Sequence, residues 1–197
     1  MDAPIRKTAT SGEGSDQDAN KPKQSVTGLK PIERLTNDDR IARIIPTADY
    51  GMEIEYYSQF ARTFIRAHYN FCAAKMTVAR DGKKLALDYR FRESEEWLEK
   101  AIVWANKFEF HRIPMVPESI HVSITVPLAG RLVNLINDYD ILFMSVSGAA
   151  FAGSITNDER NRVLLNGSRQ VLAIQQLCVP DSDRYDIGGA LLEPDQA

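Results

Sequence analysis

The segment that most constrains this fold is a nine-residue stretch, SIHVSITVP, at residues 119–127. Branched apolar side chains occupy every second position, at Ile120, Val122, Ile124 and Val126. A period of two is typical of a strand with one buried face. Pro127 ends backbone pairing and suits the first turn of a helix. We therefore predict a ribbon strand near residues 119–126 that runs directly into a helix.

Most of the remaining sequence shows helical spacing of its apolar residues. The expected helices cover roughly residues 60–81, 93–110 and 128–151. A last helix should begin at the capping box formed by Thr156 and Glu159 and end before Pro180. Residues 50–56 alternate weakly and could form a short strand. The predicted fold class is therefore mostly α with a short β ribbon.

Two segments leave alternatives open. Between residues 75 and 91, Asp81-Gly82 lies between apolar runs and is a hairpin signal, but Gly82 could instead end a helix in a left-handed cap. We favour a helix that ends near Asp81. Residues 137–140 could break the 128–151 helix in two, and we interpret Asp138 and Asp140 as cap or turn residues.

The chain is expected to form a single helical domain at residues 39–178 between two tails. Residues 1–38 are poor in large apolar side chains and are predicted to be flexible. Residues 179–197 carry five acidic residues against Arg184 alone, and we interpret them as an acidic tail. The net charge is −3, yet eight basic residues lie between Arg62 and Arg92. A local positive patch is therefore compatible with the acidic total.

Residues that carry catalysis or bind metals are sparse. The three histidines lack the spacing of a zinc site, and Cys72 and Cys178 have no close cysteine partner in sequence. The segment 148–154 has the glycine spacing of a phosphate loop but lacks its lysine. We expect no metal, no cofactor and no enzymatic activity, and we expect reduced thiols in a cytoplasmic protein. No apolar run approaches the roughly 20 residues that cross a bilayer, so no membrane partner is expected.

The polar face of the predicted strand carries His121, Ser123 and Thr125. Imidazole and hydroxyl groups can hydrogen-bond base edges in the major groove, where a two-stranded ribbon fits. A lone strand leaves backbone groups unpaired, and pairing with its copy would satisfy them in a homodimer. This predicts a ribbon-helix-helix-like dimeric core with an additional N-terminal helical region. Phosphates would be held by helix amino ends and by some of six basic residues: Lys83, Lys84, Arg90, Arg92, Arg112 and Arg131.

The stretch LINDYDIL at residues 135–142 resembles the Asp-Tyr-Asp signature of a family of AcaB-like transcriptional activators of conjugative plasmids and integrative conjugative elements. Residues 89–97 are also similar, and so are four later positions: Ile155, Arg160 or Arg162, Gly167 and Leu172. The resemblance covers roughly residues 52–178. It implies a DNA-binding regulator that acts as a dimer with a ribbon-helix-helix-like fold.

The expected function is a transcriptional regulator, an activator of conjugative transfer genes, that binds double-stranded DNA as a homodimer. RNA polymerase is a further candidate partner, which the acidic tail or the 93–110 helix could contact. The alternative is an interaction or scaffold protein of the conjugative apparatus that does not bind DNA. The negative net charge favours this alternative.

Overall fold

A computed structural model describes residues 51–193, and these residues are mostly helical with a small two-stranded sheet. The elements in chain order are strand β1 (Gly51–Tyr56), helix α2 (Gln59–Phe64), π-helix η1 (Ile65–Tyr69), helix α3 (Asn70–Thr77), helix α4 (Asp81–Ala105), strand β2 (Glu118–Ser123), helix α5 (Pro127–Phe151), helix α6 (Asn157–Cys178) and the short 3₁₀-helix η2 (Ser182–Arg184). The predicted fold class is confirmed at this level. The predicted flexible tail at residues 1–38 lies outside the described residues.

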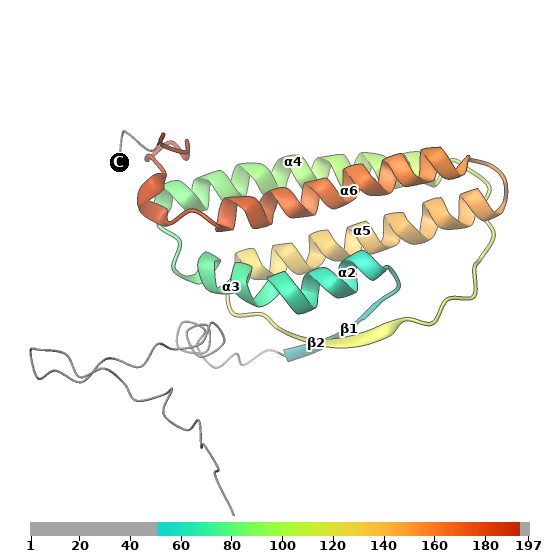
Figure 1. The fold of residues 1–197 in the computed structure, drawn as a ribbon, viewed down its shortest axis with the longest axis horizontal. Coiled ribbons are helices and arrows are strands. Elements are labelled where there is room, and N and C mark those ends of the chain that lie inside the picture. The colour runs from blue at the N-terminus through green and yellow to red at the C-terminus, as the bar shows by residue number, and fades with distance from the viewer. Residues whose placement is uncertain (1–50, 194–197) are drawn as a thin grey trace, which may run out of the picture. The chain divides into compact units, whose positions relative to one another are not determined.

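The three long helices α4, α5 and α6 lie side by side, and the shorter α2–α3 path packs against α5 (Figure 1). Their shared core is built from apolar side chains at helical spacing, which include Leu87 and Phe91 of α4, Leu132, Ile136 and Leu142 of α5, and Val171 and Ile174 of α6. Burial of these side chains is the main force that holds the bundle together. No helix among the described residues is both long enough and apolar enough to span a bilayer.

The ribbon forms within one chain. β1 pairs with β2 in antiparallel register, so that Glu53 lies opposite His121 and Ile54 lies opposite Ile120. The short strand expected at residues 50–56 is therefore confirmed, and the premise that β2 is a lone strand is wrong. β2 also ends at Ser123, three residues before the predicted end. The partner strand β1 is separated from β2 by α2, η1, α3 and α4, and a periodicity inside one strand carries no information about such a distant partner.

Neither interpretation of residues 75–91 is correct. α3 ends at Thr77, and Asp81 and Gly82 open α4, which continues without interruption to Ala105. Gly82 does not form a turn, and its lack of a side chain is needed for a close backbone contact. A Cβ atom at this position would collide with the backbone carbonyl oxygen of Asp186. The glycine therefore allows the segment after α6 to lie directly against the start of α4.

α5 is a single helix, and the break considered at residues 137–140 does not occur. Pro127 is its first residue, as predicted, and Tyr139 packs in the core in the middle of the helix. α6 begins with the predicted capping box. The Thr156 hydroxyl accepts a hydrogen bond from the Glu159 N–H, and the Glu159 carboxylate accepts one from the Thr156 N–H.

The segment that follows α6 folds back onto the bundle as far as the structure describes it. Tyr185 is buried and its hydroxyl donates to the carbonyl oxygen of Leu177 at 2.9 Å. Tyr185 also forms a β-bridge with Leu191. This part of the predicted acidic tail is thus a docked segment whose contacts fix the carboxyl end of α6.

Candidate nucleic-acid interface

The outer face of the β1–β2 ribbon holds two of the three predicted base-reading residues. His121 and Ser123 are exposed on this face. Because side chains alternate along a strand, the register places Glu53 beside His121 on the same face. A Cβ atom at Gly51 would collide with the His121 ring, so the imidazole lies over the Gly51 backbone.

The same face carries acidic side chains that the sequence did not connect with β2. Glu53 and Glu55 are both exposed and alternate with the inward-facing Ile54. Their cross-strand neighbours are His121 and Ser119. Two carboxylates therefore stand next to the row of imidazole and hydroxyl groups, and they make this face less attractive to a polyanion.

Thr125 does not share this face. It follows the end of β2, its side chain is half-buried, and its hydroxyl oxygen is buried without a hydrogen-bond partner among the described residues. The prediction that Thr125 points outward together with His121 and Ser123 is wrong. β2 ends at Ser123, and the chain then leads into α5. Beyond Ser123 the side chains no longer alternate between two faces, so the strand pattern does not predict where the Thr125 side chain points.

Lys83 is buried inside the bundle and cannot reach a phosphate. Only 1% of the residue is exposed. Its ammonium group donates hydrogen bonds to the carbonyl oxygens of Cys178 at 2.8 Å and Pro180 at 2.5 Å, and it lies over the Tyr185 ring. Burial lowers the pKa of this lysine. Lys83 therefore anchors the end of α6 and does not contribute to a positive surface.

Arg131 is engaged by two carboxylates of α4. Its guanidinium donates to Glu95 through two nitrogens at 3.0 and 2.8 Å and to Asp88 at 2.6 Å. It also lies over the Phe91 ring, 4.8 Å from the ring centroid. Such a bidentate and stacked arginine clamps α5 to α4 and has little remaining capacity for phosphate.

The other predicted phosphate contacts differ in their availability. Arg90 pairs with Glu93 at 2.9 Å and donates to Gln170 at 2.8 Å, and Arg92 pairs with Asp88 at 2.7 Å. Lys84 and Arg112 are exposed, and neither forms an ion pair within residues 51–193. Four of the six selected basic residues are thus engaged by other groups of the protein, and only Lys84 and Arg112 are exposed without an ion pair in this part of the chain.

Two arginines that the sequence analysis did not select lie beside β2. Arg66 and Arg62 both pair with Glu118 at the start of this strand, the second at 3.6 Å. Arg66 is more than half exposed. These arginines reach the ribbon because the α2–η1 segment lies beside the start of β2 in the fold. No spacing in the sequence indicates this proximity.

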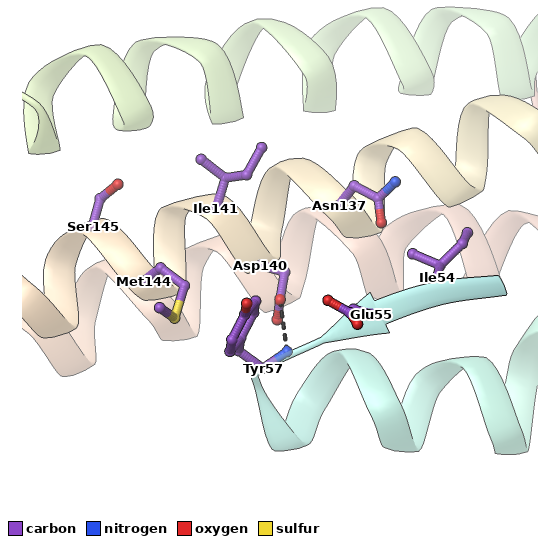
Figure 2. A pocket seen from close by; sticks show the side chains of 8 residues that line it. All are labelled: Ile54, Glu55, Tyr57, Asn137, Asp140, Ile141, Met144 and Ser145. Carbon is purple, nitrogen blue, oxygen red and sulfur yellow. Dashed lines mark hydrogen bonds between the residues drawn. The ribbon is translucent and has the colours of Figure 1, made fainter. Parts of the chain in front are cut away.

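The ribbon is attached to the bundle through Asp140. Its two carboxylate oxygens accept hydrogen bonds from the N–H groups of Tyr57 at 2.8 Å and Ser58 at 2.7 Å, where β1 ends and α2 begins (Figure 2). Ser58 in turn caps α2 by accepting from the Ala61 N–H at 3.1 Å. Asp140 is thus a cap, as its residue type suggested, but it caps a distant helix and not its own.

An open groove of about 400 Å³ lies between β1 and α5 next to this contact (Figure 2). Its lining is formed by Ile54, Glu55, Tyr57, Asn137, Asp140, Ile141, Met144 and Ser145. Most of these side chains are apolar or uncharged. The groove therefore suits an apolar occupant better than a charged small molecule.

The remaining candidates for chemistry are buried. Cys72 and Cys178 are free thiols inside the core, and the pKa of Cys72 is raised by the hydrogen bond that its S–H donates to the sulfur of Cys178 and by burial. Within residues 51–193, no group of three or more histidine, cysteine, aspartate or glutamate side chains could hold a metal ion.

Comparison of the chain with protein-family models, with curated proteins and with solved structures finds no match.

Proposed function

We propose that this protein is a DNA-binding transcriptional regulator that acts as a homodimer and activates genes for conjugative transfer. The observation that carries the proposal is the order of elements from Glu118 onward. β2 leads after three residues into α5 and then α6, which is the strand–helix–helix order of a ribbon-helix-helix unit. The resemblance of residues 135–142 to AcaB-like activators supports the same function.

The proposed dimer uses the second edge of β2. In the described sheet, β2 pairs with β1 along one edge and with no other strand. An edge with free backbone groups can pair with its own copy across a two-fold axis. The two β2 strands would then lie at the centre of a four-stranded sheet, with His121 and Ser123 of both copies on its outer face.

Phosphate contacts would come from the amino end of α5 and from exposed basic side chains. α5 has no side-chain cap. Pro127 carries no N–H, and the N–H groups of Ala129 and Gly130 donate to the Val126 carbonyl oxygen at 3.0 and 3.2 Å, so the first turn would offer a phosphate the Leu128 N–H and the positive end of the helix dipole. Lys84 and Arg112 are the selected residues that remain exposed without an ion pair in the described part of the chain. The regulator would act in the cytoplasm, and as an activator it would also contact RNA polymerase.

The proposal is tested by selecting duplex DNA fragments with the purified full chain and mapping the bound sites. We expect affinity for the selected site to fall steeply with salt, because bound phosphates release counterions. His121→Ala and Ser123→Ala should each cost roughly 1–3 kcal/mol of specific binding while non-specific binding changes little. His111→Ala, an exposed histidine outside the ribbon, is the matched control.

A second function is favoured by the charges on the ribbon. Glu53 and Glu55 flank His121 and Ser119, an arrangement that suits a protein partner with basic side chains. An interaction or scaffold protein of the conjugative apparatus would use this face without DNA. Failure of the full chain to bind duplex DNA or heparin even at low salt would reject the first function and favour this one.

A further inference from the structure

Two cysteines from distant parts of the chain meet inside the bundle. Cys72 lies in α3, and Cys178 is the last residue of α6. The two helices pack against each other, and both thiols are fully buried in the shared core. The Cys72 S–H donates a hydrogen bond to the sulfur of Cys178, so the two sulfur atoms are direct neighbours. The fold thus brings together the two groups that a disulfide bond requires.

A buried ammonium group stands beside Cys178. Nζ of Lys83 donates to the carbonyl oxygen of Cys178 at 2.8 Å and to that of Pro180 at 2.5 Å. The hydrogen bond from Cys72 and the positive charge of Lys83 lower the pKa of Cys178, against the opposing effect of burial. A thiolate is the reactive form of cysteine. Cys178 is therefore the sulfur that reacts first, and Cys72 is the thiol held ready to attack it.

The segment after α6 covers this cluster. The Tyr185 ring lies 5.9 Å from Nζ of Lys83, and its hydroxyl donates to the carbonyl oxygen of Leu177 at 2.9 Å. Two residues further on, Ile187 is 93% exposed. A short docked segment opens at a lower free-energy cost than the helices beneath it. Opening at Tyr185 gives a small oxidant a path to Cys178 while the bundle stays folded.

We propose that Cys72 and Cys178 form a disulfide bond within one chain when the protein meets hydrogen peroxide, and that the segment 180–186 controls the access of the oxidant. The bond joins α3 to the end of α6. It thereby fastens the β1–α2–α3 part of the chain, which carries one strand of the ribbon, to the last helix. This reaction is independent of whether the protein binds DNA.

The oxidation takes two steps. The Cys178 thiolate attacks one oxygen of the peroxide, the O–O bond breaks, and the leaving hydroxide takes up the proton that the Cys178 thiol released. Cys178 then carries a sulfenic acid. The Cys72 sulfur attacks the Cys178 sulfur, the S–O bond breaks, and hydroxide leaves as water with the proton of Cys72. Two electrons pass from the two thiols to the peroxide, which ends as two molecules of water.

Treatment of the reduced full chain with hydrogen peroxide tests the proposal. We expect the intact mass to fall by two hydrogen atoms and a non-reduced digest to contain one peptide pair linked through Cys72 and Cys178. Dithiothreitol should reverse both changes. The oxidised chain should unfold at a higher denaturant concentration than the reduced chain, because the cross-link restricts the unfolded state.

Single substitutions test the order of the two steps. In Cys72→Ser, Cys178 should be oxidised to a sulfenic acid that dimedone traps, because the attacking thiol is missing. In Cys178→Ser, Cys72 should stay reduced under the same exposure, since its thiol is protonated and lacks the stabilising cation. Labelling of Cys72 in the second variant at the rate of Cys178 in the first would reject the role of Lys83.

Substitution of Tyr185 tests the control of access. Tyr185→Ala removes the ring over Lys83 and the hydrogen bond to Leu177, and it should speed disulfide formation at least about threefold. Tyr89→Ala, which removes a 55% exposed tyrosine of α4, is the matched control and should leave the rate unchanged. Equal rates in the two variants would show that the segment does not limit access.

Two further results would overturn the disulfide itself. The first is retention of both thiols in the folded chain under an exposure that links the same cysteines after unfolding in denaturant. The second is a linkage between two chains, seen as a doubled mass on a non-reducing gel, in place of the bond within one chain.

Discussion

At the scale of single residues, Asp140 decides how the ribbon is joined to the bundle. It connects α5 to the β1–α2 junction, 82 and 83 residues earlier in the chain, through two backbone N–H groups. An aspartate in the middle of a helix usually competes for nearby backbone groups. Here a distant segment supplies the donors, which explains why Asp140 does not cause the break that the sequence left open at residues 137–140.

Asp140→Ala should lower the free energy of unfolding by about 1–3 kcal/mol, because it leaves two buried or half-buried N–H groups without an acceptor. Equilibrium chemical denaturation measures this change. Asp140→Asn keeps one amide oxygen as an acceptor and should cost less. An alanine variant as stable as the unchanged chain would show that the two contacts contribute no net stability.

Lys83 illustrates why residue type alone misleads about function. In the sequence it belongs to a basic block, and a solvent-exposed lysine is by far the commonest case. The tertiary structure places it under the carboxyl end of α6, where two carbonyl oxygens satisfy its ammonium group. Those carbonyls lie about a hundred residues away in sequence, so no local pattern could have revealed this burial.

At the scale of elements, the start of helix α6 was predicted from the sequence, as was that of α5. Thr156→Ala removes the hydroxyl that accepts the Glu159 N–H, and it should cost about 1 kcal/mol of stability. Thermal or chemical unfolding measures the change, with Thr63→Ala on the exposed face of α2 as the control. An equal effect of the two substitutions would contradict a specific role for the cap.

The capping box also predicts a dependence on pH. Hydrogen bonds from Thr156 lower the pKa of Glu159 below its usual value in the folded protein. Its contribution to stability is therefore present above the pKa of the unfolded chain and is lost as the pH falls through the folded pKa. The difference between the unchanged chain and Thr156→Ala should accordingly shrink in acid.

At the scale of the whole molecule, the charges around the ribbon separate the two candidate functions. The double substitution Glu53→Gln with Glu55→Gln should strengthen binding to duplex DNA by about two- to tenfold if DNA contacts this face. Fluorescence anisotropy at several salt concentrations measures the affinity. Glu99→Gln with Glu109→Gln changes the net charge equally at two exposed positions outside the ribbon. Equal gains for both doubles would show that DNA does not contact the ribbon.

Much of the architecture follows from local rules that act over a few residues. Apolar spacing predicted the long helices, the alternation at residues 119–126 located β2, and Pro127 marked the start of α5. Their exact limits were less accessible. α4 begins at Asp81 instead of near residue 93, and its first turn lies against Asp186, a residue far along the chain that local spacing does not reveal.

The sequence by itself determined which stretches become helix or strand and where caps and stops occur, since these depend on neighbours within one or two turns. Only the tertiary structure decided that β2 pairs with β1, that Asp140 caps a distant helix, and that Lys83 and Arg131 are internal clamps. The physical reason is that pairing, burial and ion pairing join segments tens of residues apart, and free energy, not sequence distance, selects among such partners.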